Sequence, residues 1–226
     1  MNKPVALAIG AHPDDIEFMM GGTVALLSQA GHEVHYLNLA NGSMGTSTES
    51  REAIIARRTG EARAAAVKLG AVFHEPLVDD LQIFYERALV SQVCAVIRTV
   101  KPAVLLVQSP QDYMEDHTNA CRVALTAAFC RGMRNYLSDP PCPPIQEEVT
   151  VYHALPWGLR GPLRERICAG QYVNITSVME TKRVALACHK SQKEWLDISQ
   201  GLDSYLITME EMARDVGLMS GRFEYA

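Results

Sequence analysis

The residues best suited to chemistry lie close to the N-terminus, directly after an apolar run at residues 5–9. His12 and Asp15 are three residues apart on a turn that Pro13 tightens, so they are close enough to bind one metal ion together. We expect Asp14 to point elsewhere and to stay free. A zinc ion that does chemistry usually takes three protein ligands and keeps one position for water. Two candidate ligands are present here, so a third must come from further along the chain.

The apolar run before this turn is typical of a strand buried on both faces of a sheet, and Gly10 closes it. Ligands of open α/β sheets bind at the carboxyl ends of the strands. A second apolar run, residues 103–107, is also followed by polar residues, which end at His117 before a helix expected over residues 118–136. We therefore expect the tips of two non-adjacent buried strands to bring His117 to the two ligands of the first turn.

The rest of the chain alternates between strand and helix signals. Further strands are expected at residues 33–39, 71–74, 149–154 and 171–175, and further helices at residues 18–30, 49–69, 88–100, 176–192 and within 195–226. Thr176 is expected to cap the helix that it opens. This alternation favours an α/β fold with a Rossmann-like, parallel-rich sheet, helices on both faces and a small C-terminal extension.

Length and composition favour one domain. The chain has 226 residues, of which 48% are hydrophobic, and this is enough for a single well-buried core over residues 1–226. A proline-rich loop at residues 138–144 cannot continue a helix. It divides a core α/β part, residues 1–137, from a C-terminal part, residues 138–226, which is expected to complete the sheet and the site.

Composition also narrows the classes of partner. A net charge of −5 without a basic cluster favours small molecules or proteins over nucleic acid. There is no signal-peptide pattern and no apolar run of about 18 residues, so we expect no membrane span and a cytoplasmic location. The 6 cysteines lack CxxC spacing, which predicts reduced, packed thiols. A nucleotide-binding domain is a distant alternative, because no glycine-rich phosphate fingerprint follows the first strand.

The first turn belongs to a longer motif. Residues 11–17, AHPDDIE, resemble the signature of the PIG-L/LmbE-like family of zinc-dependent de-N-acetylases. Weaker motifs follow in the family's order and approximate spacing, up to about residue 192: Arg58-x-x-Glu61, Asp80, Pro110-x-Asp112, Asp116-His117 and His189-x-Ser191-Gln192. The first motif is specific, and the later ones are persuasive only together.

The resemblance implies a zinc site and a reaction. It implies that His12, Asp15 and His117 bind Zn²⁺ and that Asp14 is the general base. The chemistry agrees, because zinc lowers the pKa of its bound water and polarises an amide carbonyl, while a free carboxylate can pass the proton to the leaving amine. The implied activity removes an N-acyl group, acetyl in the first instance, from N-acetylglucosamine or a related amino-sugar conjugate. A homo-oligomer is left open.

Substrate contacts are assigned less directly. The candidate substrate-binding residues are Arg58, Asp80, Asp112, Tyr113 and His189. Arg58 occupies the position where members of the family contact substrate, and its alternative is a solvated helix charge paired with Glu61. His189 either lines the site or packs in the core. The loop at residues 40–47 either forms a wall of the site or is an ordinary connection.

The residues of the proposed centre have simpler alternatives too. Asp14 opens a helix, so it could act only as an N-cap or first-turn carboxylate. Glu17 is interpreted mainly as a residue that starts the helix or supports the ligands. A histidine like His117, taken alone, is more often a surface or core residue than a ligand.

One position departs from the family's pattern. Where the family commonly has His-Pro-Asp-His, this chain has Met114-Glu115-Asp116-His117. Methionine cannot donate a hydrogen bond, and loss of one oxyanion donor lowers rates by about 10²–10³. Either Tyr113 or His189 takes this role, or the enzyme is weaker or differently specialised. The alternative function is a catalytically weakened metal- or ligand-binding protein on the same fold.

Overall fold

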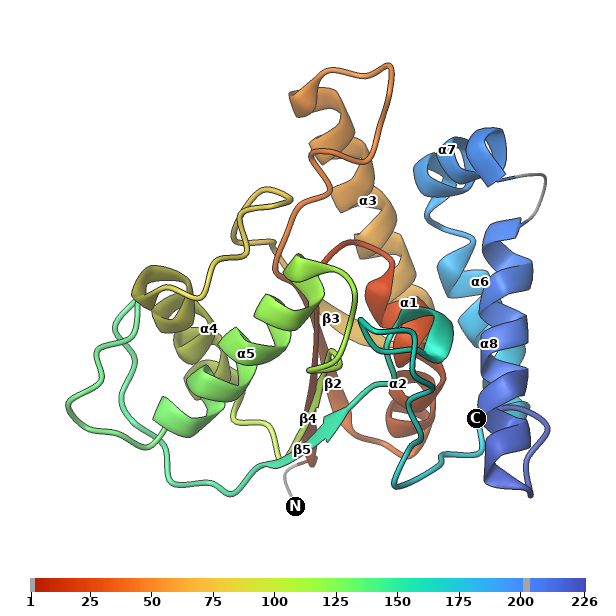
Figure 1. Cartoon of the computed structure of the whole chain (residues 1–226). Coiled ribbons are helices and arrows are strands. Elements are labelled where there is room, and N and C mark those ends of the chain that lie inside the picture. Colours follow the sequence, from red (N-terminus) through yellow and green to blue (C-terminus); the bar gives the residue numbers. More distant parts are fainter. Residues whose placement is uncertain (1–2, 201–203) are drawn as a thin grey trace.

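A parallel sheet of five strands forms the centre of the molecule, in the order β3-β2-β1-β4-β5 (Figure 1). The structure is a computed structural model and describes residues 3–200 and 204–226. The strands are β1 (Val5–Gly10), β2 (Glu33–Asn38), β3 (Ala71–His74), β4 (Val104–Val107) and β5 (Thr150–His153). The predicted α/β class with a parallel sheet is confirmed.

Helices cover both faces of the sheet, as predicted (Figure 1). One face carries α4 (Arg87–Val100) and α5 (Glu115–Cys130), and the other carries α1 (Asp15–Met19), α2 (Gly21–Gln29), α3 (Arg51–Leu69) and α6 (Met179–Leu186). Because successive side chains of a strand alternate between faces, Leu7 and Ile9 pack in one apolar cluster and Ala6 and Ala8 in the other. The apolar run of β1 thus reflects burial on both sides.

The two strands that precede the predicted metal ligands, β1 and β4, are neighbours in this sheet. Ala6 of β1 pairs with Val104 of β4, and Ile9 pairs with Val107, so the expectation of two non-adjacent strands was wrong. The chain leaves β1 towards β2 and β3 on one side and leaves β4 towards β5 on the other. Ligands of such sheets bind where the direction of winding reverses. The segments after β1 and β4 therefore start side by side at this switch point.

Two predicted helices differ from the structure near the site. The helix expected over residues 18–30 is two helices, α1 and α2, which meet at Met20. Gly22 of α2 lies so close to Ile175 that an added Cβ would be 2.7 Å from its side chain, so this contact requires glycine. The helix expected over residues 118–136 is α5, which begins and ends earlier. His117 therefore lies in the first turn of α5 rather than before it.

The C-terminal part departs most from expectation. Residues 171–175 do not form a strand, because the Ile175 amide donates to the Tyr225 carbonyl instead of to the sheet. The helix expected over residues 176–192 is a 3₁₀ turn (Thr176–Val178) followed by α6 and, after a break, α7 (Lys190–Gln200). Thr176 is not a helix cap, and its hydroxyl accepts a hydrogen bond from the Tyr225 amide.

The C-terminal helix and the cysteines differ from expectation in details. The last helix is α8 (Ser204–Ser220), and the part of the expected helical segment at residues 201–203 lies outside the described residues. All six cysteines are free; Cys168 is exposed rather than packed. No helix among the described residues has the length and apolar character needed to span a membrane.

Candidate metal centre

Three predicted ligands meet at the switch point. His12 and Asp15 follow β1, His117 follows β4, and one ligand atom from each lies within 4.8 Å of the others. The His117 Nε2 atom is 3.3 Å from Asp15 Oδ1, and the His12 Nδ1 atom is 3.5 Å from Asp15 Oδ2. Asp15 and His117 are buried and His12 is half-buried. The structure thus brings together the residues expected to share one ion.

The imidazole rings of His12 and His117 each contact a second carboxylate besides Asp15. Asp112 Oδ2 is 3.0 Å from His117 Nδ1, and Asp116 Oδ2 is 2.9 Å from His12 Nε2. These contacts leave the other nitrogen of each ring facing Asp15. Histidines that bind metals usually donate their second N–H to such a carboxylate, which orients the ring. Two oriented imidazoles and one carboxylate form a donor set that fits a zinc ion.

The carboxylates around His12 and His117 favour the binding of a cation between them. Burial opposes ionisation of Asp15, but the two imidazoles hold the pKa of its carboxyl well below the usual range. Burial also lowers the pKa of the rings, yet Asp116 and Asp15 raise the pKa of His12 to about 9. Asp15 and Asp112 similarly raise the pKa of His117 to about 10. The carboxylates therefore stabilise positive charge at this place.

The turn separates Asp14 from the ligands. The His12 amide donates to Asp15 Oδ2 at 2.7 Å, and the Asp15 amide donates to the His12 carbonyl. These two hydrogen bonds stabilise the turn. Asp14 adopts a φ of 114°, which is strained for any residue other than glycine. Its side chain makes no capping hydrogen bond to α1, although it occupies the N-cap position. The simple capping alternative is therefore not what the structure shows.

The Asp14 carboxylate is held by a residue from the other end of the chain. The Tyr205 hydroxyl of α8 donates to Asp14 Oδ2 at 2.7 Å, and Arg58 Nη2 lies 3.8 Å from the same oxygen. Oδ1 has no hydrogen bond to any described residue. Burial raises the pKa of Asp14, and the Asp15 charge adds to this, while Arg58 opposes it. The carboxylate has one oxygen held in place and the other available.

Arg58 is buried and donates a hydrogen bond to the turn that carries Asp14. It is 3% exposed, so it is not the solvated helix charge considered as an alternative. Its guanidinium donates to the Pro13 carbonyl at 2.7 Å and to the Gly42 carbonyl at 3.4 Å. Gly42 has a φ of +81°, and a Cβ there would overlap Arg58. The expected alternative partner, Glu61, instead accepts hydrogen bonds from Ser191.

The loop at residues 40–47 is anchored beside the centre. Asp80 accepts the Gly42 amide at 2.7 Å and the Met44 amide at 2.9 Å, while its own amide donates to the Ser43 hydroxyl. Both carboxylate oxygens of Asp80 thus hold this loop. Asp80 also lies 3.8 Å from Arg58, which connects the loop to the turn that carries Asp14.

The other predicted substrate residues differ in position. Asp112 accepts hydrogen bonds from the Met114 and Trp157 amides besides facing His117, so its carboxylate is fully engaged. Tyr113, next to it, is 62% exposed. His189 is completely buried, and its Nε2 lies 3.4 Å from Glu17 Oε2.

Glu17 is more than a residue that starts a helix. It is fully buried, accepts the Tyr36 hydroxyl at 3.1 Å and faces His189. Burial lowers the pKa of His189, but the charge and the side-chain contact of Glu17, together with the charge of Asp14, outweigh burial and raise it. This buried pair supports α1 from the inside, close enough to Asp14 for the two charges to interact.

Sequence reasoning did not single out two residues of the centre. Asp116 was noted only as part of a motif, yet one of its oxygens accepts both from the His12 ring and from the Leu81 amide at 2.7 Å. Leu81 has a φ of 62°, which is uncommon outside glycine. Tyr205 lies in a segment without any motif, and no local signal pointed to it.

Comparisons with known proteins find related sequences. Residues 7–129 match the sequence model of the family described as PIG-L: GlcNAc-PI de-N-acetylase. The diacetylchitobiose deacetylase of Thermococcus kodakarensis is 29% identical over 228 residues, covering 95% of this chain and 78% of the relative. The 4-oxalmesaconate hydratase of Pseudomonas putida is 30% identical over 204 residues, covering 85% of this chain and 76% of the relative.

A solved structure shows the same fold. The N,N′-diacetylchitobiose deacetylase of Pyrococcus horikoshii superposes with a TM-score of 0.82 at 24% identity, covering 99% of this chain and 82% of that chain. At this identity the likeness concerns the fold alone. The parallel sheet and its covering helices are therefore shared over nearly the whole length.

Proposed function

We propose that this chain, which belongs to the PIG-L de-N-acetylase family, is a zinc-dependent hydrolase. The enzyme removes an N-acyl group, acetyl in the first instance, from an amino sugar or a related small conjugate. One observation supports the proposal: His12, Asp15 and His117 cluster together, and the neighbouring residue Asp14 has one oxygen that accepts from Tyr205 and one that accepts no hydrogen bond from a described residue. The deacetylase relative that is named for diacetylchitobiose supports an N-acetylated amino sugar as the substrate class.

The three residues would hold the ion through His12 Nδ1, one Asp15 oxygen and His117 Nε2. Bound zinc supplies a Lewis acid for the amide carbonyl and lowers the pKa of water towards neutrality. Asp112 and Asp116 keep the rings oriented, since each accepts from the nitrogen that faces away from Asp15.

Asp14 is the proposed proton carrier. Its Oδ1 atom takes a proton from the attacking water and delivers it to the leaving nitrogen. Burial raises the pKa of Asp14, which brings the carboxyl nearer to the working pH of a general base. The Tyr205 hydroxyl holds the other oxygen and Arg58 holds the turn, so the Asp14 carboxylate has little conformational freedom.

Substrate contacts are proposed at the mouth of the centre. Exposed Tyr113 is placed to stack on or donate to a sugar ring. The loop that Asp80 and Arg58 anchor would form the opposite wall. His189 is completely buried, so it cannot contact the substrate directly. It would affect substrate binding only indirectly, through its contact with Glu17 of α1. Of the two oxyanion donors considered in place of Met114, Tyr113 is the more accessible.

The function is tested by metal analysis and a panel of substrates. We expect the purified chain to bind about one zinc per chain and to release free amine from N-acetylglucosamine or diacetylchitobiose, measured with an amine-reactive fluorophore. A chelator should stop the release, and added Zn²⁺ should restore it. A protein that cannot bind zinc, or one that binds zinc but hydrolyses no amide in the panel, would contradict the proposal.

A hydratase is the second candidate. The relative from Pseudomonas putida that is 30% identical is named as a 4-oxalmesaconate hydratase, and Met114 cannot donate to the tetrahedral oxyanion of amide hydrolysis. The same panel therefore includes 4-oxalmesaconate, whose hydration is followed by ultraviolet absorbance. Turnover of this compound without amine release would favour the hydratase. Zinc binding without turnover of either class would favour a catalytically weakened binding protein.

Tyr205 is predicted to position Asp14. Tyr205→Phe removes the hydroxyl that donates to Asp14 Oδ2 and leaves the buried ring in place, so kcat should fall about tenfold with little change in KM. Steady-state kinetics and zinc content are measured together. Tyr225→Phe, which removes a hydroxyl that contacts Arg214 away from the centre, serves as the matched control. An unchanged kcat, or a loss of zinc equal to the loss of activity, would argue against positioning.

A further inference from the structure

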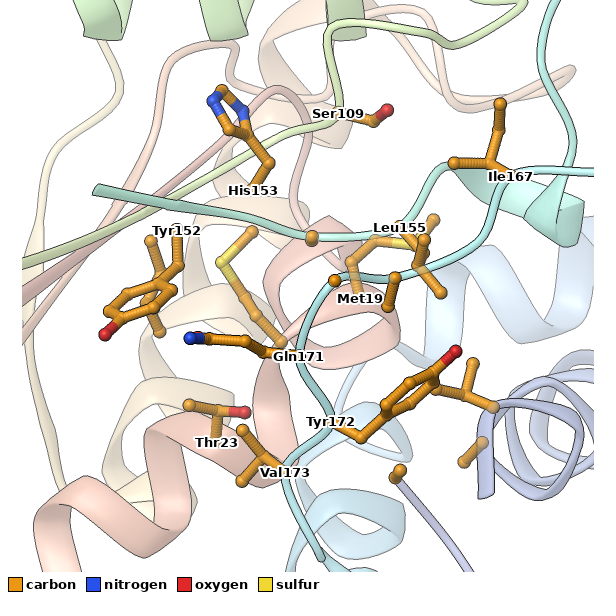
Figure 2. Close-up of a pocket in the computed structure, with 18 of the residues that line it drawn as sticks. Met19, Thr23, Ser109, Tyr152, His153, Leu155, Ile167, Gln171, Tyr172 and Val173 are labelled. Atoms are coloured by element: carbon orange, nitrogen blue, oxygen red, sulfur yellow. The ribbon is translucent and has the colours of Figure 1, made fainter. Parts of the chain in front are cut away.

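A cavity of about 1020 Å³ lies beside the edge strand β5, apart from the metal centre. None of the three candidate ligands lines it. Figure 2 shows Tyr152 and His153 of β5, Gln171 on the facing segment, and Met19 and Thr23 around this space. The cavity shares α1 and the segment after β4 with the metal centre, but different residues of these segments line the two places.

The walls of this cavity are mainly apolar. Phe18, Leu106 and Ile167 are among the side chains that form them, and neutral polar groups such as Thr23 and Gln171 are interspersed. No aspartate or glutamate is among the lining residues that the structure describes. Such walls suit the apolar body of a ligand better than a bare sugar, whose hydroxyl groups would need many hydrogen-bond partners.

Lys182 of α6 is the one lysine or arginine among these lining residues. It is only 4% exposed, and it makes no hydrogen bond or ion pair with any described residue. Its stem lies against the start of α2, where a Cβ on Gly21 would be 3.5 Å from Lys182 Cγ. Burial lowers the pKa of Lys182 to about 8, so the amine remains mostly protonated at neutral pH.

An ammonium at the wall of a mainly apolar cavity is solvated less well than one at the open surface, and no described residue pairs with this one. An anion that enters the cavity would supply the missing partner. We propose that this cavity is a second ligand site, which binds a small molecule that carries one carboxylate or phosphate group on an apolar body, with Lys182 pairing the anionic group. This site is separate from the proposed reaction, whose substrate needs no charge.

The proposal is tested with octanoate and octyl phosphate as probes on the full chain, freed of metal so that neither probe can bind at the metal centre. Calorimetry should detect binding of at least one of them, and the tighter one identifies the anionic group. Lys182→Met should weaken that binding about ten- to hundredfold, whereas Lys182→Arg should retain most of it. Lys68→Met, which removes an exposed lysine on α3, should change nothing.

Three further measurements test the same site. Lys182→Met should melt no lower than the unaltered chain, because methionine keeps the apolar stem and removes the unpaired charge. In the unaltered chain, the bound probe should slow alkylation of Cys168, which lines the cavity, but not of Cys142, which does not. Peptide mass spectrometry separates the two thiols. Thr23→Phe, which fills part of the cavity, should also weaken binding.

Three results would overturn the proposal. These are the absence of binding by both probes, equal affinity in the unaltered chain and in Lys182→Met, and binding of uncharged 1-octanol as tight as that of octanoate. Binding should persist in Asp14→Asn, since Asp14 does not line the cavity. The outcome is therefore independent of whether the chain hydrolyses amides.

Discussion

Replacing Asp14 by asparagine is expected to lower kcat by a factor of about 10²–10⁴, the range associated with loss of a positioned general base. Asparagine keeps the size of the side chain and can still contact the Tyr205 hydroxyl, but it cannot take a proton. Zinc content and KM should change little, because Asp14 is not one of the three clustered ligands. Kinetics on the substrate that responds best, with parallel metal analysis, measure the effect.

The control for Asp14 is a carboxylate of the same kind far from the centre. Asp215→Asn on α8 removes an exposed carboxylate and should leave kcat unchanged. If Asp14→Asn retained the kcat of the unaltered enzyme, the proton would have to pass through another group. A large loss of zinc in Asp14→Asn would instead mean that this carboxylate contributes to the binding of the ion.

Replacing His117 by alanine is expected to remove zinc and activity together. His117 supplies one of three ligand atoms, and its loss leaves the Asp15 and Asp112 carboxylates facing an empty space. Loss of an outer supporting partner alone lowers metal affinity by about 10- to 100-fold, so loss of the ligand itself should exceed this range. Competition with a chromophoric chelator measures the affinity.

A graded comparison makes this test sharper. Asp112→Asn should weaken zinc binding by only about 10- to 100-fold, because the ring of His117 remains and only its orientation suffers. His32→Ala, a half-buried histidine away from the cluster, should have no effect on zinc. A His117→Ala protein that still held zinc as tightly as before would show that the third ligand lies elsewhere.

The parallel sheet and the clustering of His12, Asp15 and His117 were predictable because their signals are local. The apolar run of β1 indicates a strand that is buried on both faces of the sheet, and His12 and Asp15 follow it within one turn. A second buried strand followed by His117 repeats this pattern. Each of the three residues follows a buried strand in the sequence, so the strand pattern was enough to indicate that they could meet. The order of the strands was not local, and their adjacency was missed.

The structural features that sequence analysis predicted wrongly or missed depend on contacts between segments that are distant in the sequence. Residues 171–175 look like a strand, but Ile175 pairs with the backbone of Tyr225. Tyr205 meets Asp14 only because α8 packs across the start of α1, and Lys182 is buried only because α6 covers α2. Alternation and spacing describe one segment at a time. They do not describe which segments pack together.

A single oxygen of Asp116 serves both the His12 ring and the amide of Leu81, and this sharing has a thermodynamic consequence. A compound that shifted the backbone at Leu81 would also change the support of the His12 ring. If the proposed ion binds at His12 and a substrate contacts this loop, binding of the one would be linked to binding of the other, and such linkage acts equally in both directions. An ion held firmly would favour the loop geometry seen here, and a substrate that favours this geometry would slow escape of the ion.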